Sequence, residues 1–520
     1  MAAGILLSRL FGLVRSRLLG HFLGTGDAAD AFYAAIKIPN VLQNLFGEGV
    51  LSASFIPVYS RLLAEGDDEE AGRVAGAVGA LLALTSTVLV VLGVVLAPVA
   101  IPLIAPGFAG EKRDLTILLV QVMFPGVGLL VLSAWALGVL NSHGRFFLSY
   151  VSPVAMNVVM IAALLWFGPD SSGDMRAQAH LATMVAWASV VGSAAQLLVQ
   201  LPTLWGVERR LRLAARNRVG EIHVRTVLRN FLPVFLGRGV VQVSGYVDSI
   251  LASLIVAGSV AMLGYAQVIA MLPVSLFGMS VAAAELPAMS RLRGSDAEVT
   301  AALRAKLHDG LRRIAFYVVP SAAALLLLGD VIGAMLYRTG AFTRSDVVWL
   351  WQVLAGSSVG LLASTLGRLY ASAWYALRDT KTPLRFATIR VVLTIVLGYI
   401  AALRLPGWLG LDPRWGVAGL TASAGVAAWV EFSLLRRSIA RRLGGTDMGG
   451  RYLAILWFCA LLAAGAAWLV KLGLGTERAV LLGLVALPVY ASAYLLLAGG
   501  FGIAEVSALR ERVGRMLRRR

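Results

Sequence analysis

The stretch LLALTSTVLVVLGVVLAPVAIPLI, residues 81–104, decides the fold class of this chain. It has no charged side chain, and it exceeds the roughly 20 residues with which a helix crosses the hydrocarbon core of a bilayer. Comparable apolar runs recur along the chain, at residues 115–140, 178–203, 314–337, 386–403 and 479–500. The chain is therefore predicted to be an all-α polytopic membrane protein.

The overall composition agrees with a membrane protein. Of the 520 residues, 58% are hydrophobic and only 14% are charged, whereas soluble proteins carry about 25% charged residues. The longest hydrophilic segments, near residues 206–229 and 291–313, are too short to form a domain with its own core. Any chemistry must therefore take place within the membrane.

Fourteen spans are predicted from the apolar runs. They lie near residues 4–24, 30–60, 75–105, 115–140, 147–168, 178–205, 230–257, 260–290, 314–337, 347–376, 386–403, 415–435, 452–470 and 479–500. Most of the 46 Lys and Arg residues fall on one set of alternating loops and on the C-terminal tail. The positive-inside rule makes this side cytoplasmic, so both termini are predicted to be cytoplasmic. The net charge of +18 then reflects topology and contacts with anionic lipid rather than nucleic-acid binding.

The two halves of the chain resemble each other. The motif FIPVYSRL begins at Phe55 and ELPAMSRL begins at Glu285, an offset of 230 residues. LNSHGRF begins at Leu140 and LRDTKTP begins at Leu377, an offset of 237 residues. Six spans separate the paired motifs, so both halves have one orientation, as in parallel transporter repeats. We predict an N-terminal lobe at 1–220, a C-terminal lobe at 221–445, and two further helices with a basic tail at 446–520.

Three cations, Arg9, Arg15 and Lys37, lie inside predicted spans. A cation in the bilayer core costs several kcal/mol, so such residues are rare and usually face a water-filled cavity. The alternative is a buried ion pair that only fixes helix packing, but nearby acids are too few to neutralise all three cations. We therefore predict a cavity for an anionic ligand. Arg17 points to the opposite face of its helix and is expected to extend to the interface.

The second span carries a polar stripe. At 100° per residue, Asp30, Lys37, Asn44 and Glu48 fall within about 40° of one another. Four polar groups on one face of an apolar helix are expected to line a cavity or to meet another polar helix. The two carboxylates offset part of the positive charge or take part in ion coupling.

The seventh span repeats this pattern. Arg238, Gln242, Gly245 and Ser249 share one face, and Asp248 lies about 80° away from it. We predict that Arg238 adds positive charge to the same site.

Signals for enzyme chemistry are weak. No two of the five histidines lie at metal-ligand spacing, and the phosphate-binding Walker loop and the nucleophile elbow are both absent from the sequence. The chain is predicted to be neither an enzyme nor a metal or cofactor protein. Its single cysteine, Cys459, excludes an intramolecular disulfide.

Motifs spread from the first to the eleventh span resemble those of the MurJ (MviN) family. They are SRLFGLVR at 8–15, GTGDAADAF at 24–32, KIPNVL at 37–42, FGEG at 46–49, SASFIP at 52–57, LNSHGRF at 140–146, SPVAMN at 152–157, YVDSILAS at 246–253 and ALRDTKTP at 376–383. This family forms the lipid II flippase group of the multidrug/oligosaccharidyl-lipid/polysaccharide (MOP) exporter superfamily.

The resemblance implies fourteen helices in two six-helix lobes, with two terminal helices beside a groove for the lipid tail. It also implies a location in the cell inner membrane, and we expect a monomer. The expected activity moves the undecaprenyl-pyrophosphate-linked peptidoglycan precursor, lipid II, from the inner to the outer leaflet by alternating access. Membrane potential or an ion gradient is the implied driving force.

The resemblance also implies roles for individual residues. Arg9, Arg15, Lys37, Asp30 and Glu48 match family positions, and the family's cavity arginines meet the pyrophosphate and the sugar-peptide headgroup. The chain departs from the family pattern at two places. Gln43-Asn44 stands where a basic pair is usual, and Gln267-Val268 stands where an Asp-Arg pair often occurs, so the predicted site is less positive than the family norm.

Two alternatives to a lipid II flippase remain open. A sister exporter would move another polyprenyl-linked glycan or a cationic drug, but a drug site would need an acidic, aromatic cavity, which Arg9, Arg15 and Lys37 argue against. A non-transporting membrane scaffold derived from a flippase would explain the loss of basic residues at Gln43 and Val268.

Overall fold

The computed structural model describes most of the chain, and all regular structure in the described part is helical. The described residues are 2–46, 51, 54–171, 174–207, 225–227, 229, 231, 245–279, 281, 285, 289, 295–377, 379–445, 448–474 and 478–517. Two compact units are present. The first comprises residues 1–261 with 339–342, and the second comprises 262–338 with 343–520. The predicted all-α class is confirmed.

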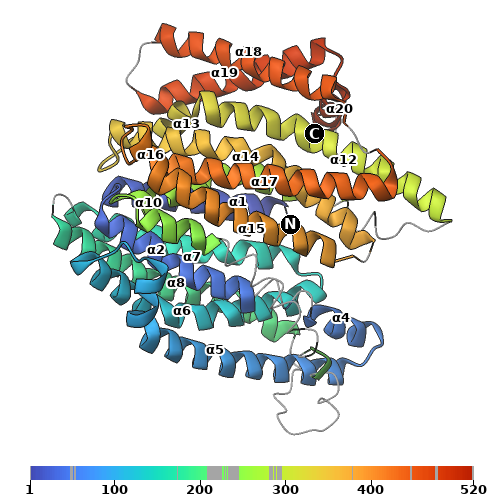
Figure 1. Ribbon diagram of the computed structural model, residues 1–520. Coiled ribbons are helices and arrows are strands. Elements are labelled where there is room, and N and C mark those ends of the chain that lie inside the picture. Colours follow the sequence, from blue (N-terminus) through green and yellow to red (C-terminus); the bar gives the residue numbers. More distant parts are fainter. Residues whose placement is uncertain are drawn as a thin grey trace. The chain divides into compact units, whose positions relative to one another are not determined.

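The first unit is a bundle of long helices (Figure 1). Its elements are α1 (Ala2–Leu23), α2 (Asp27–Phe46), α4 (Ile56–Ala64), α5 (Asp68–Ile104), α6 (Gly110–Ser142), α7 (Phe146–Phe167), a 3₁₀ turn at Pro169–Ser171 and α8 (Met175–Val207). α6 packs against α2, α5 and α8, and α7 packs against α1 and α8. Residues 245–253 are also helical. The N-terminal candidate residues therefore lie on helices that pack closely on their neighbours.

The second unit contains the remaining elements. They are α10 (Ser259–Pro273, whose first three residues belong to the first unit), a π-helical turn at Val274–Met279, α12 (Asp296–Leu327), α13 (Gly329–Tyr337), α14 (Arg344–Ala376), α15 (Lys381–Tyr399), a π-helical turn at Ile400–Arg404, α16 (Leu405–Trp408), α17 (Trp415–Leu443), α18 (Gly450–Leu474), α19 (Ala479–Gly500) and α20 (Ala504–Leu517). α14 packs against α12 and α17, and α18 packs against α12 and α19.

The described residues include ten helices that are long and apolar enough to cross a membrane. Two predicted spans need correction. The span at 314–337 is two helices that meet at Leu328, and the span at 30–60 includes α2, which ends at Phe46, and the separate helix α4. The predicted seventh span at 230–257 lies largely outside the described residues. The predicted lobe boundary at residue 220 also lies outside them and stays a prediction.

Capping side chains explain why several helices begin before their apolar runs. Ser295 and Glu298 form a capping box at the start of α12, and Thr343 and Asp346 form one at the start of α14. Each box satisfies backbone N–H groups that have no carbonyl partner within the helix. The caps extend these helices beyond the hydrocarbon layer, where hydropathy alone gives no signal.

The paired loop motifs occupy equivalent places in the two units. LNSHGRF lies between α6 and α7, and LRDTKTP lies between α14 and α15; α6 and α14 each have 33 residues. In the second loop, the Asp379 carboxylate accepts hydrogen bonds from the backbone N–H of Thr382 and of Lys381. The hydrogen bonds from Thr382, foremost, lower the pKa of Asp379. The matching helices and loops support the predicted repeat.

Helices α14 and α17 approach each other through glycine. A Cβ added at Gly360 would overlap the backbone of Gly425, and a Cβ at Gly356 would overlap the backbone of Ala418. Gly356 and Gly360 have the small-xxx-small spacing by which membrane helices bring their backbones together. The indole N–H of Trp429 donates to the Val359 carbonyl at 2.8 Å beside this crossing.

Gly360→Ala is therefore expected to lower the thermal unfolding temperature of the purified protein. The added methyl group meets backbone, which cannot rotate away, and overpacking of this kind costs about 1–3 kcal/mol. Gly367→Ala, on the same helix, is the matched control, because its Cβ would lie 3.9 Å from the Leu435 side chain. Equal unfolding temperatures for the two variants would contradict this assignment.

Candidate functional site and family

The first unit buries the predicted site residue Asp30 almost completely, with 1% of its surface exposed. One carboxylate oxygen accepts the backbone N–H of Ala261 at 2.8 Å. The other oxygen accepts the backbone N–H of Gly258 at 2.7 Å and the ammonium group of Lys112 at 2.5 Å. Asp30 thus joins α2 to the start of α6 and to the first turn of α10.

This arrangement accounts for a carboxylate in an apolar surrounding. The first backbone N–H groups of a helix have no intrahelical acceptor, and the helix dipole favours negative charge there. Lys112 supplies the opposite charge, and Asp27 shares it at 2.9 Å. The Lys112 ammonium also lies over the ring of Phe108, 4.2 Å from its centroid. A buried charge with this number of partners fixes the positions of the segments that hold it.

Lys37 lies seven residues after Asp30 on α2. Its ammonium group donates to the hydroxyl of Ser249, and Asp248 is the opposite charge that acts on it. Both partners come from helical residues 245–253, whose polar face the sequence indicates. The polar stripe of the second span therefore meets a polar part of the seventh. Lys37 itself is partly buried, and among the described residues the neutral hydroxyl of Ser249 is its hydrogen-bond partner.

Arg15 is partly buried on α1 and faces α7. One of its guanidinium nitrogens lies 3.7 Å from the thioether sulfur of Met160. A thioether is a weak, uncharged acceptor, so this contact does not neutralise the guanidinium. Next to it, the Ser16 and Tyr33 hydroxyls lie 3.3 Å apart and link α1 to α2.

The other predicted site residues have less defined surroundings. Arg9 is exposed on α1. Asn44 lies on α2, but its side chain is outside the described part of the chain, as are Glu48 and Arg238 altogether. Whether all seven residues line one cavity stays a prediction.

Lys112 is the participant that the sequence did not single out. It lies at the start of α6, outside the apolar runs. A lysine there can be solvated, so its presence in the sequence is not unusual. Its role appears only because the fold places it against Asp30, 82 residues earlier in the chain. In the part of the chain that is described, no cluster of His, Cys, Asp and Glu side chains has an arrangement that would hold a metal ion.

The fold and these positions agree with a family comparison. The family model described as Lipid II flippase MurJ matches residues 19–482 of the chain. The chain belongs to the MurJ family. A probable lipid II flippase MurJ from Rhizobium tropici is 31% identical and aligns with 95% of this chain and 92% of its own length.

Solved structures show the same fold. The lipid II flippase MurJ in an inward closed conformation has a TM-score of 0.78 at 23% identity, over 96% of this chain and 98% of its own. An inward-facing multidrug resistance MATE family transporter of the MOP superfamily has a TM-score of 0.65 at 17% identity, over 84% of this chain and 95% of its own. The family resemblance is confirmed. The MurJ family consists of flippases rather than enzymes, and this member is a multi-pass inner-membrane protein.

Proposed function

We propose that the chain is a lipid II flippase that moves the undecaprenyl-pyrophosphate-linked precursor from the inner to the outer leaflet by alternating access. Family membership supports this activity. The observation that carries the proposal is the position of Lys37, a partly buried cation on α2 whose ammonium group donates to the neutral hydroxyl of Ser249.

The chemistry of the substrate suits these residues. A pyrophosphate cannot cross hydrocarbon unaided, because removing its charge from water is too costly. Fixed cations replace the lost water, and arginine's planar fork of donors matches phosphate oxygens. In this proposal Arg9, Arg15, Lys37 and Arg238 bind the headgroup. Asn44, Glu48 and Asp30 belong to the same polar stripe.

Asp30 and Lys37 have different tasks in this mechanism. The carboxylate of Asp30 holds α2 against the first turn of α10, so that the helix that carries Lys37 has a fixed position. Lys37 exchanges its hydroxyl partner, Ser249, for a substrate phosphate oxygen. The negative charge of Asp248 favours the charged form of this lysine.

Topology completes the proposal. Both termini lie on the cytoplasmic side, as the basic loops indicate, and the protein acts as a monomer. A coupling ion or the membrane potential supplies the driving force. The absence of the family's usual basic residues at Gln43 and Val268 favours a second candidate, a flippase-derived scaffold without transport activity.

Complementation of a flippase-depleted bacterium, combined with leaflet-resolved labelling of lipid II, tests this function. With this chain as the sole flippase, we expect growth and the appearance of labelled lipid II in the outer leaflet. If growth fails and lipid II stays in the inner leaflet, the scaffold is correct. If a different polyprenyl-linked glycan crosses instead, the chain is a sister exporter.

A further inference from the structure

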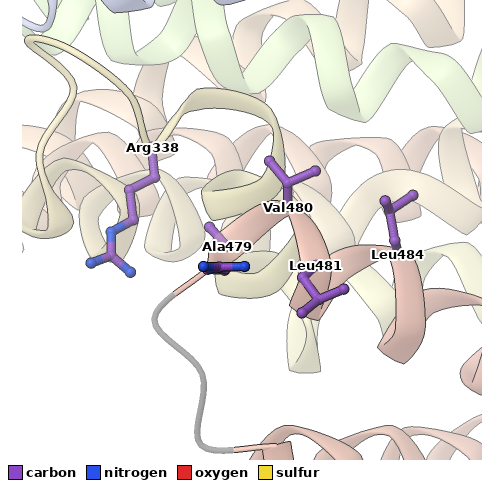
Figure 2. A pocket seen from close by; sticks show the side chains of 6 residues that line it. Arg338, Ala479, Val480, Leu481 and Leu484 are labelled. Carbon is purple, nitrogen blue, oxygen red and sulfur yellow. The ribbon is translucent and has the colours of Figure 1, made fainter.

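The second unit contains a pocket of about 570 Å³ at the start of α19, far along the chain from the site above. Figure 2 shows Arg338 on one side and Val480, Leu481 and Leu484 of α19 on the other. The remaining lining residues are Arg478 and Ala479. Two guanidinium groups and a series of apolar side chains thus share one concave surface.

Close helix packing creates this arrangement. α13 packs against α19, and a Cβ at Gly483 would overlap the side chain of Met335. The absence of a side chain at Gly483 therefore lets α13 lie directly on α19. Arg338 is the first residue after α13, and Arg478 is the last residue before α19. The packing of the two helices brings both cations to one end of α19.

The electrostatics of the pocket favour an anion. The first backbone N–H groups of α19 have no carbonyl acceptor within the helix, and the positive end of the helix dipole lies there. Both guanidinium groups add to that potential, and none of the six described lining residues is acidic. Arginine forms bidentate hydrogen bonds with phosphate.

The apolar side of the pocket identifies the kind of anion. Val480, Leu481 and Leu484 are 44%, 45% and 63% exposed, and α19 is a candidate membrane span. Exposed leucines on a spanning helix contact hydrocarbon. The ligand that matches both halves carries a phosphate at the membrane surface and an acyl chain below it.

We propose that this pocket binds an anionic glycerophospholipid, with its phosphate at Arg338 and Arg478 and an acyl chain along Leu481 and Leu484. On the predicted topology, the loops after the ninth and thirteenth spans share the membrane face opposite the termini, so the lipid belongs to that leaflet. The volume falls within the roughly 300–1,000 Å³ of small-molecule sites. It has room for a glycerophosphate headgroup. This lipid site is additional to the proposed transport of lipid II.

Native mass spectrometry of the full-length purified chain tests the site, with dioleoyl phosphatidylglycerol and dioleoyl phosphatidylcholine as probes. The wild-type chain is expected to retain phosphatidylglycerol preferentially. The double variant R338Q/R478Q is expected to lose at least about tenfold in affinity, because both charge-assisted contacts to the phosphate are lost. R338K/R478K keeps the charge and is expected to retain part of the preference.

The matched control is Arg404→Gln, an exposed arginine on the same predicted face that contacts Tyr399. It is expected to bind phosphatidylglycerol as the wild type does. Equal retention of both lipids, or an unchanged affinity in R338Q/R478Q, overturns the proposal. Displacement of the lipid by inorganic phosphate also overturns the proposal, because it indicates a simple anion site. The proposal is likewise overturned if R338Q/R478Q loses affinity only for added lipid II, because that result indicates a substrate site.

The growth assay separates this proposal from the flippase proposal. R338Q/R478Q leaves Arg15 and Lys37 intact, so rescue of the depleted bacterium is scored independently of lipid retention. Failure of the wild-type chain to rescue growth while it still retains phosphatidylglycerol contradicts the flippase proposal alone. Rescue without lipid preference contradicts the lipid site alone.

Discussion

Arg15→Ala is expected to abolish rescue of a flippase-depleted bacterium. The variant removes a guanidinium that lies on an apolar helix against the thioether of Met160, and with it the proposed contact to pyrophosphate. Truncating one partner of a buried charge pair costs about 2–5 kcal/mol, so a loss near 3 kcal/mol lowers substrate affinity by about a hundredfold. Colony formation after depletion, at matched protein levels, measures the effect.

Arg17→Ala is the matched control, because it removes the same charge two residues away on the other face of α1. It is expected to rescue growth. Arg15→Lys should rescue in part, since an ammonium keeps the charge but not the planar fork of donors. Full rescue by Arg15→Ala would remove Arg15 from the proposed headgroup site, and equal tolerance of Arg9→Ala and Lys37→Ala would refute the site as a whole.

Asp30→Asn is expected to lower the stability of the first unit strongly. The change removes the negative charge that Lys112 meets at 2.5 Å and weakens the acceptor of two backbone N–H groups. Breaking a buried pair by removing one partner costs about 3–5 kcal/mol. Asp27, 2.9 Å from Lys112, still compensates part of the lysine's charge, so the loss is expected at the lower end of that range. Thermal unfolding of the purified protein in detergent measures this loss.

Two further variants measure how much of this stability comes from the ion pair of Asp30 and Lys112. Asp27→Asn removes the more exposed partner of Lys112 and is expected to cost at most about 1 kcal/mol. The double variant Asp30→Asn with Lys112→Met is expected to lose less stability than the two single variants lose together, since the buried cation is removed along with its partner. Simple additivity of the two losses would mean that the ion pair does not hold these segments together.

Much of the fold follows from hydropathy alone. Runs such as 115–140 and 479–500 coincide with α6 and α19 because a helix must satisfy its own backbone in lipid. Hydropathy does not locate the end of a helix that continues into water. It also does not reveal a break between two helices inside one apolar run. The Ser295 capping box starts α12 well before its apolar segment, and Leu328 separates α12 from α13.

Some residues of the candidate site can be predicted from the sequence and others cannot. The solvation cost of Arg15 and Lys37 marks them in the sequence, and the helical period places Ser249 on a polar face that Lys37 meets. The partners of Asp30 carry no such mark. Gly258 lies 228 residues away and contributes only a backbone N–H, so tertiary structure alone brings it to the carboxylate.

The glycine crossing of α14 and α17 has a mechanical consequence. Shear is a small sliding of packed helices past each other, and a tightly packed interface does not deform continuously. At Gly360 and Gly425 backbone meets backbone. We therefore expect α14 and α17 to move together as one body, and bending within this unit to occur at its irregular turns, such as the π-helical segments at Val274–Met279 and Ile400–Arg404.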